Sequence, residues 1–263
     1  MSAYVTAYEH FNEYRSILKM TTGSANFDSL IDSIQEGQFY LFYGSNKVVL
    51  DGLVYGLLVN CVLPKQKHGF ESMVLYINNT DYYQPDKSKI LSPETIANAA
   101  KCMGIEPKVV FKNIFAQVAY NQRHQLAIAK QVVDFITTTR NQDIRLLVIN
   151  NLTKYFKESK YKNYAASILK EVIGILSKVC AQNRIALICT GDANATSKGV
   201  VARPVGGTYL KHAFNVIVYL RESISHPQAY KATLVKHQYS KTPKSVLLHT
   251  RKASRMLLLL DGS

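Results

Sequence analysis

The residues with the clearest potential for chemistry form a short glycine-bearing segment, Gly44-Ser45-Asn46-Lys47-Val48. An apolar run typical of a buried strand precedes it at 39–43, and an apolar run with helical spacing follows at 48–62. A strand, a glycine-bearing loop with a lysine, and a helix are the parts of a phosphate-binding loop. In such a loop backbone N–H groups cradle phosphate, the lysine contacts phosphate oxygens, and a Ser or Thr hydroxyl binds Mg²⁺. The chemistry that this segment suggests is therefore nucleotide binding.

The segment departs from the pattern G-x-x-x-x-G-K-[ST] that this chemistry requires. Lys47 matches the lysine, but Val48 takes the Ser or Thr position and cannot bind a metal ion, and Asn46 replaces the final glycine. Counting back without a gap puts Leu41 at the first glycine, whereas aligning Gly44 there leaves the loop about three residues short. We expect a degenerate nucleotide site. Lys47 is then a solvated or capping lysine, which we favour, or a contact for weak, metal-free nucleotide binding.

The elements that must position this loop follow an alternating pattern. Strand-like runs rich in β-branched residues occur at 38–43, 73–78, 109–115, 145–150 and 185–190. Helical patterns occur at 48–62, 92–103, 123–140 and 164–182. Continuous apolar strands that alternate with helices predict a parallel sheet covered on both faces. Three close strands at 214–221, 230–238 and 245–250, without helices between them, predict an antiparallel extension of that sheet.

Composition limits the class of protein. A chain of 263 residues with 47% hydrophobic residues fits one large α/β domain, or a core with a small appendage. No apolar run approaches the roughly 18 to 20 residues of a membrane span, and the charged N-terminus lacks the apolar stretch of a secretory signal. The four cysteines lie far apart, as expected for buried thiols in a reducing compartment. We expect an intracellular protein without a membrane segment.

Positive charge is the second informative feature. The 32 Lys and Arg residues exceed the 18 Asp and Glu residues, giving a net charge of +14. Such an excess fits binding to a polyanion such as nucleic acid, or a basic surface that serves solubility alone. Clustering favours the first interpretation, because lysines alternate with tyrosines between residues 154 and 164. The members of this cluster are Lys154, Tyr155, Lys157, Lys160, Tyr161, Lys162 and Tyr164.

Several short motifs appear in a fixed order: Thr22-Gly23-Ser24, Phe27-Asp28-Ser29-Leu30, the broken loop at 44–48, the run 146–153, and Arg203-Pro204-Val205-Gly206-Gly207 followed by His212. In order and spacing they resemble the RecA/RadA recombinase family, closest to its archaeal and eukaryotic branch, over about residues 4–250. The resemblance implies an α/β fold of the RecA-like P-loop NTPase type. It has a mostly parallel central sheet, helices on both faces and a C-terminal antiparallel extension. We expect an N-terminal arm and short helix at 1–21, a core at 22–263, and none of the family's N-terminal helical domain.

The resemblance also implies where the remaining catalytic groups should lie, and none is matched. Asn150, an amide, takes the place of the Walker B carboxylate that orders Mg²⁺ through water. The glutamate that polarises the attacking water falls on Thr80, with Asp81 one residue away, and the γ-phosphate-sensing glutamine falls on Asp192. We therefore predict no catalytic residue, no metal site and no cofactor, with Asn150 satisfying backbone groups at a strand end. The alternative is an active DNA-dependent ATPase in which Lys47 and Asp81 suffice.

A second resemblance concerns protein docking. Filaments of this family assemble when an F-x-x-A segment of one protomer's arm enters apolar pockets on its neighbour. Tyr4-Val5-Thr6-Ala7 matches that segment at the expected distance from the motif at 22–24, which makes Tyr4 and Ala7 candidate docking residues. A tyrosine keeps the aromatic ring and adds a hydroxyl that needs a partner when buried. The alternative is a mobile terminus that matches by chance.

DNA contact in the family comes from two loops, which correspond here to about 155–165 and 193–207. The lysine and tyrosine side chains of the first suit phosphate contact and base stacking. The candidate DNA-binding residues are Lys157, Lys160 and Lys162 in the first loop and Lys198, Arg203, Gly206 and Gly207 in the second. The alternatives are a solvated helix face for the lysines and a helix-start turn for the glycines.

The function that these features favour is assembly. We expect a non-catalytic paralogue of the RadA-type recombinases that acts in homologous recombination and DNA repair. It would dock onto a recombinase or another paralogue and bind single-stranded DNA. The alternatives are the active ATPase described above and a protein-interaction scaffold without DNA contact.

Overall fold

The computed structural model describes residues 6, 8, 16–81, 91–139, 143–197, 200–224, 226, 229–253 and 256–260. From residue 250 onward it describes the backbone alone. The predicted docking residues Tyr4 and Ala7 and the predicted DNA contact Lys198 lie outside the described residues.

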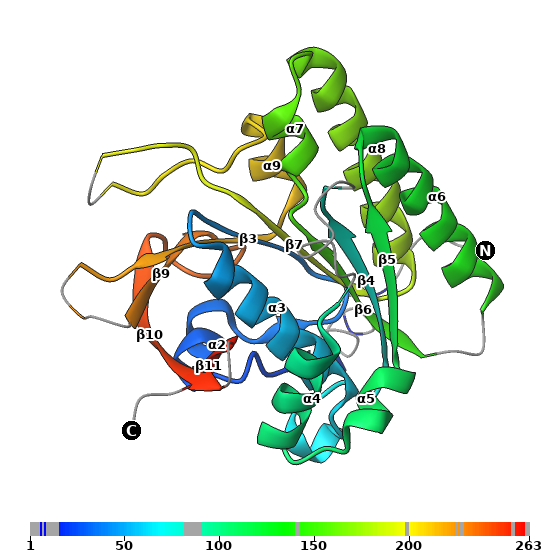
Figure 1. Ribbon diagram of the computed structural model, residues 1–263, viewed down its shortest axis with the longest axis vertical. Coiled ribbons are helices and arrows are strands. Elements are labelled where there is room, and N and C mark those ends of the chain that lie inside the picture. The colour runs from blue at the N-terminus through cyan, green and yellow to red at the C-terminus, as the bar shows by residue number, and fades with distance from the viewer. Residues whose placement is uncertain are drawn as a thin grey trace.

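Within the described residues, the fold is built on a sheet of nine strands (Figure 1). Their order across the sheet is β11 (Met256–Leu260), β10 (Lys244–Ala253), β9 (Ala229–Lys236), β8 (Val216–Glu222), β3 (Phe39–Gly44), β7 (Ala186–Asp192), β6 (Ile144–Asn150), β4 (Met73–Asn79) and β5 (Ile114–Ala119). The strands from β8 to β5 pair in parallel, and β9, β10 and β11 continue the sheet in antiparallel pairing. The predicted parallel sheet with an antiparallel C-terminal extension is confirmed.

Helices cover both faces of the sheet, as predicted. One face carries α2 (Ala25–Ile31), α3 (Lys47–Val62), the 3₁₀ turn η1 (Lys65–Lys67), α4 (Pro93–Cys102) and α5 (Pro107–Lys112). The other face carries α6 (Gln122–Thr138), α7 (Lys154–Glu158), α8 (Lys162–Gln182) and α9 (Thr208–Ala213). Alternation along β3 explains the two layers, because Tyr40 and Phe42 join the first core whereas Leu41 and Tyr43 join the second.

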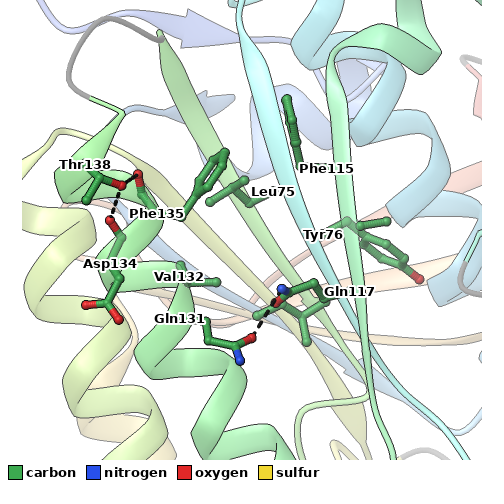
Figure 2. A pocket seen from close by; sticks show the side chains of 11 residues that line it. Leu75, Tyr76, Phe115, Gln117, Gln131, Val132, Asp134, Phe135 and Thr138 are labelled. Atoms are coloured by element: carbon green, nitrogen blue, oxygen red, sulfur yellow. Dashed lines mark hydrogen bonds between the residues drawn. The ribbon is translucent and has the colours of Figure 1, made fainter.

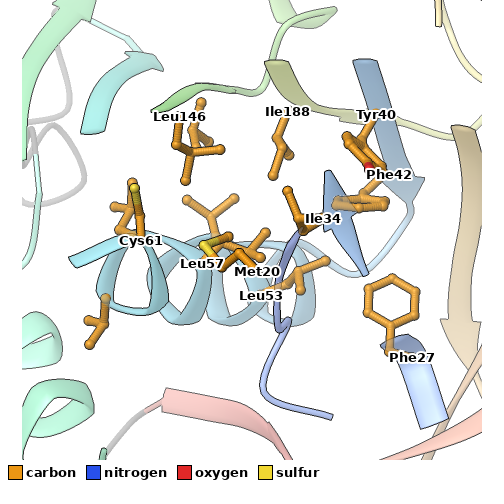
Figure 3. Packing of buried hydrophobic residues seen from close by; sticks show 14 of the residues in the cluster. Met20, Phe27, Ile34, Tyr40, Phe42, Leu53, Leu57, Cys61, Leu146 and Ile188 are labelled. Atoms are coloured by element: carbon orange, nitrogen blue, oxygen red, sulfur yellow. The ribbon is translucent and has the colours of Figure 1, made fainter. Parts of the chain in front are cut away.

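Helix α3 is the centre of the first core (Figure 3). Its residues Leu53 and Leu57 are fully buried beneath Leu146 of β6 and Ile188 of β7. Apolar residues surround the helix on nearly all sides, as expected for a helix packed between a sheet and further helices. From Val49 onward α3 is held in place by this packing, whereas Lys47 and Val48 at its amino end are exposed.

A short pair of strands closes the amino end of the described core. β1 (Lys19–Met20) pairs antiparallel with β2 (Ile34–Gln35), and Met20 is completely buried in the first core. Next to β2, the buried carboxylate of Glu36 pairs with the guanidinium of Arg145 on β6 at 2.5 Å. This ion pair ties the start of the core to the centre of the sheet.

Two expectations about the elements need correction. The segment 109–115 was predicted as a strand, but α5 occupies Pro107–Lys112 and the strand β5 begins only at Ile114. Pro107 stands in the first turn of α5, where its missing N–H removes no hydrogen bond, so the apolar run that follows is helical. The antiparallel extension also contains a further strand, β11, that the pattern did not predict.

Candidate nucleotide site at the carboxyl edge of the sheet

The turn between β3 and α3 is too short to cradle phosphate. β3 ends at Gly44 and α3 begins at Lys47, so only Ser45 and Asn46 connect them. Gly44 is itself part of the sheet, and a Cβ atom added there would overlap the carbonyl oxygen of Leu220 on β8. The glycine is therefore explained by strand packing, and the loop lacks the backbone N–H groups that would surround a phosphate.

The amino end of α3 is occupied by the chain itself. The side-chain Oδ1 of Asn46 accepts a hydrogen bond from the N–H of Val49 at 3.3 Å and so caps the helix. Its Nδ2 donates to Glu222 Oε1 at 2.7 Å, which places a carboxylate beside the turn where a phosphate would have to lie. Lys47 and Val48 are both exposed to solvent. An anion approaching this helix end would meet the exposed ammonium group of Lys47 as well as the carboxylate of Glu222, and both residues line a cavity of about 420 Å³.

Asn150 lies at the centre of a buried network of side chains. Its Nδ2 donates to Asp51 Oδ1 of α3 at 2.9 Å and lies 3.5 Å from both Tyr76 Oη and Asn78 Oδ1 of β4. Its Oδ1 accepts from Thr190 Oγ1 of β7 at 2.5 Å. The amide therefore bonds to side chains and not to the backbone groups that we expected at this strand end. It directs N–H groups toward α3 and offers no oxygen to a metal ion there.

Asp51 carries the carboxylate of this network. Burial raises the pKa of Asp51, while the hydrogen bond from Asn150 and the charge of Lys47 lower it, and burial is the larger effect. Sequence reasoning missed Asp51, although a charged residue inside an otherwise apolar helix was a visible signal.

Helix α7 pairs with the acidic residues near the expected catalytic positions. Lys154 Nζ lies 2.9 Å from Asp81 Oδ2 and 2.8 Å from Glu158 Oε1, and the lysine side chain is nearly buried. Lys157 Nζ lies 3.1 Å from Asp192 Oδ1 at the end of β7. Both carboxylates are thus neutralised by the chain's own lysines.

The first predicted DNA loop is largely helical, since residues 159–161 alone separate α7 from α8. Lys157 is engaged with Asp192, as described above. Lys162 Nζ donates to the carbonyl oxygens of Phe156 at 2.9 Å and Lys157 at 2.8 Å, at the carboxyl end of α7. Lys160 is exposed, and its side chain has no hydrogen bond or ion pair with the described residues. Of these three predicted contacts, Lys160 alone has an unengaged charge.

The second predicted DNA loop, 193–207, is closed at its base. The N–H of Asn194 donates to the carbonyl of Arg203 at 2.9 Å, and the buried hydroxyl of Tyr43 donates to the carbonyl of Ala202 at 2.7 Å. The side chain of Arg203 is exposed, so its charge remains accessible.

The two glycines of this loop have different reasons to be glycine. Gly206 has a φ of +111°, and an added Cβ would lie 2.6 Å from Leu210 Cδ1 of α9. Gly207 has a φ of +79°, is exposed, and has open space where a Cβ would be. Gly206 is therefore explained by packing at the start of α9, and Gly207 is the one that leaves room for a ligand.

An apolar pocket that the sequence did not predict lies at the β5 edge of the sheet (Figure 2). It has a volume of about 490 Å³ and lies between β4, β5 and α6. The rings of Phe115 and Phe135 lie 5.5 Å apart at one end, and Gln117 and Gln131 are joined by a hydrogen bond of 3.4 Å. The strand was predicted at 109–115 and not at Ile114–Ala119, so the sequence analysis did not identify which side chains of β5 face this pocket.

Two classes of site are not found in the described part of the chain. There, no group of three or more His, Cys, Asp or Glu side chains could hold a metal ion. None of the helices in the same residues combines the length and apolar character needed to cross a bilayer.

Comparison with known proteins agrees with this architecture. The chain is similar to the DNA repair and recombination proteins RadA of Aeropyrum pernix, with 29% identity over 229 residues, and of Metallosphaera sedula, with 28% identity over 229 residues. Each alignment covers 83% of this chain and 67% of the relative. It is also similar to the DNA repair protein RAD51 of Mycosarcoma maydis, with 24% identity over 234 residues, which cover 83% of this chain and 65% of that protein. This chain thus spans about two thirds of the length of these relatives.

A family model described as Rad51 matches residues 13–234, which include β3, α3 and the strands that carry Asn150 and Asp192. The match covers well over half of the sequence. The chain belongs to the Rad51 family.

Proposed function

We propose that this chain is a non-catalytic recombinase paralogue that acts in homologous recombination and DNA repair. It docks onto a RadA-type recombinase or another paralogue, inside the cell, and binds single-stranded DNA without hydrolysing ATP. The observation that carries the proposal is the two-residue turn between β3 and α3, where Asn46 caps the helix and bonds to Glu222.

Three separate requirements for ATP hydrolysis are unmet in ways that reinforce each other. The turn has too few N–H groups for phosphate, and Val48 and Asn150 cannot order a metal ion. The nearby carboxylates Asp81 and Asp192 are already paired with lysines of α7. Recovery of any one requirement would leave the other two unmet.

The apolar pocket at the β5 edge supports docking. Family filaments use an aromatic residue of one protomer's arm as an anchor on its neighbour. This pocket offers an apolar cavity beside β5, which is the last strand at that end of the sheet among the described residues. An extended segment can pair with such an edge while its side chains enter the pocket. A partner's arm is the occupant that we propose for it. The chain's own Tyr4 and Ala7 would make the corresponding contact on a neighbour.

Nucleotide turnover tests the catalytic part of the proposal. Purified protein should show no ATP hydrolysis above background, with or without Mg²⁺ and single-stranded DNA. Turnover that Lys47→Ala abolishes would contradict the proposal and establish the DNA-dependent ATPase instead.

Co-purification with a RadA-type recombinase tests the docking part. Phe115→Ala should weaken the association, because Phe115 lines the pocket. Phe111→Ala is a matched control: Phe111 is 40% exposed against 38% for Phe115, but it lies on α5 outside the pocket. Equal retention of partner by both variants would contradict pocket docking.

A scaffold without DNA contact is the second candidate. The internal engagement of Lys157 and Lys162 favours it, because these lysines are then less available to phosphate. Failure to bind single-stranded oligonucleotides, alone and in complex with the partner, would establish it over the DNA-binding proposal.

A further inference from the structure

Asp192, at the end of β7, lies where the two candidate DNA loops meet. Its carboxylate is 3.1 Å from Lys157 Nζ of α7, in the first loop. Its N–H donates to Thr153 Oγ1 at 3.2 Å, directly before α7, and its carbonyl accepts from the N–H of Val205 at 2.9 Å, at the base of the second loop. One residue at the edge of the sheet therefore contacts both loops.

Further hydrogen bonds hold the end of β7 against the start of α7. The N–H groups of Leu152 and Asn151 donate to the carbonyl oxygen and to Oγ1 of Thr190, both at 2.8 Å. Gly191 permits this close approach, because a Cβ atom added there would lie 3.1 Å from Thr153 Oγ1. The backbone on both sides of the ion pair is thus held in place, so forming the pair costs little additional main-chain entropy.

The two side chains of this pair differ in exposure. The side chain of Lys157 is 52% exposed, whereas that of Asp192 is only 12% exposed. Moving the lysine onto a phosphate would leave a largely buried carboxylate without its cation. That costs more free energy than opening a pair between two exposed side chains. The carboxylate of Asp192 therefore competes with any phosphate for Lys157.

The other two lysines predicted to contact DNA in the first loop do not meet this competition. Lys162 donates to carbonyl oxygens, which carry no net charge, so its own charge is not neutralised. Lys160 has no ion pair within the part of the chain that the structure describes. Of the three lysines, Lys157 alone pairs with a carboxylate of the described residues. The charge that the sequence places in this loop is thus reduced in the folded chain.

We propose that Asp192 restrains Lys157 and thereby lowers the affinity of this chain for single-stranded DNA. A strand that reaches α7 has to displace the carboxylate before Lys157 can contact a phosphate. Asp192 acts through Lys157 and does not itself contact the strand. The inference rests on the DNA-binding part of the proposed function and adds an internal restraint on it.

Asp192→Asn tests the restraint, because it removes the charge and keeps the size of the side chain. In fluorescence anisotropy with a labelled oligothymidylate, the variant should bind about fivefold more tightly than wild type, the upper end of what a surface ion pair contributes. The slope of log K against log salt on a single strand changes by about −0.7 for each phosphate neutralised. One additional phosphate contact should make the slope steeper by about that amount, which a change in stability alone would not do.

Lys157→Gln shows whether the gain passes through this lysine. It should change the affinity of the otherwise wild-type chain by less than about twofold, but it should abolish the gain of Asp192→Asn, as expected for residues that act on each other. Glu171→Gln is the matched control. Glu171 lies in the middle of α8 and pairs with Lys130 at 3.7 Å, and its loss raises the net charge as much as Asp192→Asn does. This control should stay within about twofold of wild type.

The outcomes separate this inference from the function on which it rests. Asp192→Asn binding no more tightly than Glu171→Gln, or a gain that survives Lys157→Gln, would overturn the restraint while leaving DNA binding in place. So would an equal loss on Lys157→Gln with and without Asp192→Asn, because Lys157 would then already contact phosphate. Urea denaturation identifies the variants that are folded. Absence of binding to any oligonucleotide by both folded wild type and folded Asp192→Asn would overturn the DNA-binding proposal together with this inference.

Discussion

The substitution Asn150→Asp tests whether the buried network around residue 150 depends on an amide at this position. It restores the carboxylate that the recombinase resemblance implies at this position. In the protein as it stands, Asn150 Nδ2 donates to Asp51 Oδ1 at 2.9 Å. The variant would replace that donor with a second carboxylate at a similar distance. A favourable contact would become a repulsive one inside a largely buried network.

The size of the effect follows from the distance and the burial. Two unit charges about 4 Å apart interact by about 4 kcal/mol at an effective dielectric constant of about 20. Uptake of one proton by the pair and the positive charge of Lys47 reduce this repulsion. We expect the free energy of unfolding at pH 7.5 to fall by about 2 to 4 kcal/mol, which includes the lost hydrogen bond.

The pH dependence has a defined sign. Burial already raises the pKa of Asp51 in the folded protein, and a second carboxylate would raise it further. The folded state then binds more protons than the unfolded state at intermediate pH, so stability increases as pH falls toward the pKa of the folded state. The loss should therefore be smaller at pH 5 than at pH 7.5. The double variant Asn150→Asp, Asp51→Asn should recover most of it at pH 7.5.

Urea denaturation at pH 5 and pH 7.5, together with ATP turnover in the presence of Mg²⁺ and single-stranded DNA, measures these quantities. The expected result is a destabilised variant without turnover. A variant as stable as wild type at pH 7.5 that gains Mg²⁺-dependent hydrolysis would refute the reasoning, because the network would then not depend on the amide.

Three further predictions concern the supports of the site, each measured by urea denaturation with wild type as reference. Gly44→Ala should lower the free energy of unfolding by about 1 to 3 kcal/mol, because the added Cβ overlaps the carbonyl oxygen of Leu220. An unchanged free energy would mean that β8 can shift. Arg145→Ala should lower the free energy of unfolding by about 3 to 5 kcal/mol, because it leaves Glu36 as an unpaired charge whose side chain is only 2% exposed. The double variant that adds Glu36→Gln should recover part of this loss. Tyr43→Phe should cost about 1 to 2 kcal/mol by removing a buried hydrogen bond of 2.7 Å, and an unchanged midpoint would show that water replaces it.

Local patterns predicted most of the fold because they depend on which faces of each element are buried. The apolar run before Gly44 became β3, and the long apolar segment after it became α3, within one residue of the predicted ends. The prediction of a strand at 109–115 was wrong because a short apolar run does not distinguish a helix from a strand by itself. Pro107 decided the outcome by starting a helix, so the strand had to begin after it.

The positions where the chain departs from the phosphate-binding motif could be identified in the sequence. The contacts that the residues at those positions make could not. Lys47, Val48 and Asn150 could be compared with a motif position by position. Glu222 reaches Asn46 across 176 positions of sequence, and Asp51 reaches Asn150 across 99. Such contacts are set by the strand order and the path of the chain, which no local pattern encodes.

Buried polar groups at the carboxyl edge of the sheet must find hydrogen-bond partners within the chain when no ligand supplies them. In this chain the side chain of Asn46 caps α3 by accepting from the N–H of Val49, and the side chain of Asn150 bonds to Asp51 and Thr190. These contacts hold the carboxyl edge of the sheet in one arrangement without a ligand. Under the proposed function, association of this chain with a partner should therefore be independent of any nucleotide of its own. The test measures the affinity of this chain for a partner whose own nucleotide site is disabled, with and without ATP. The two affinities should be equal.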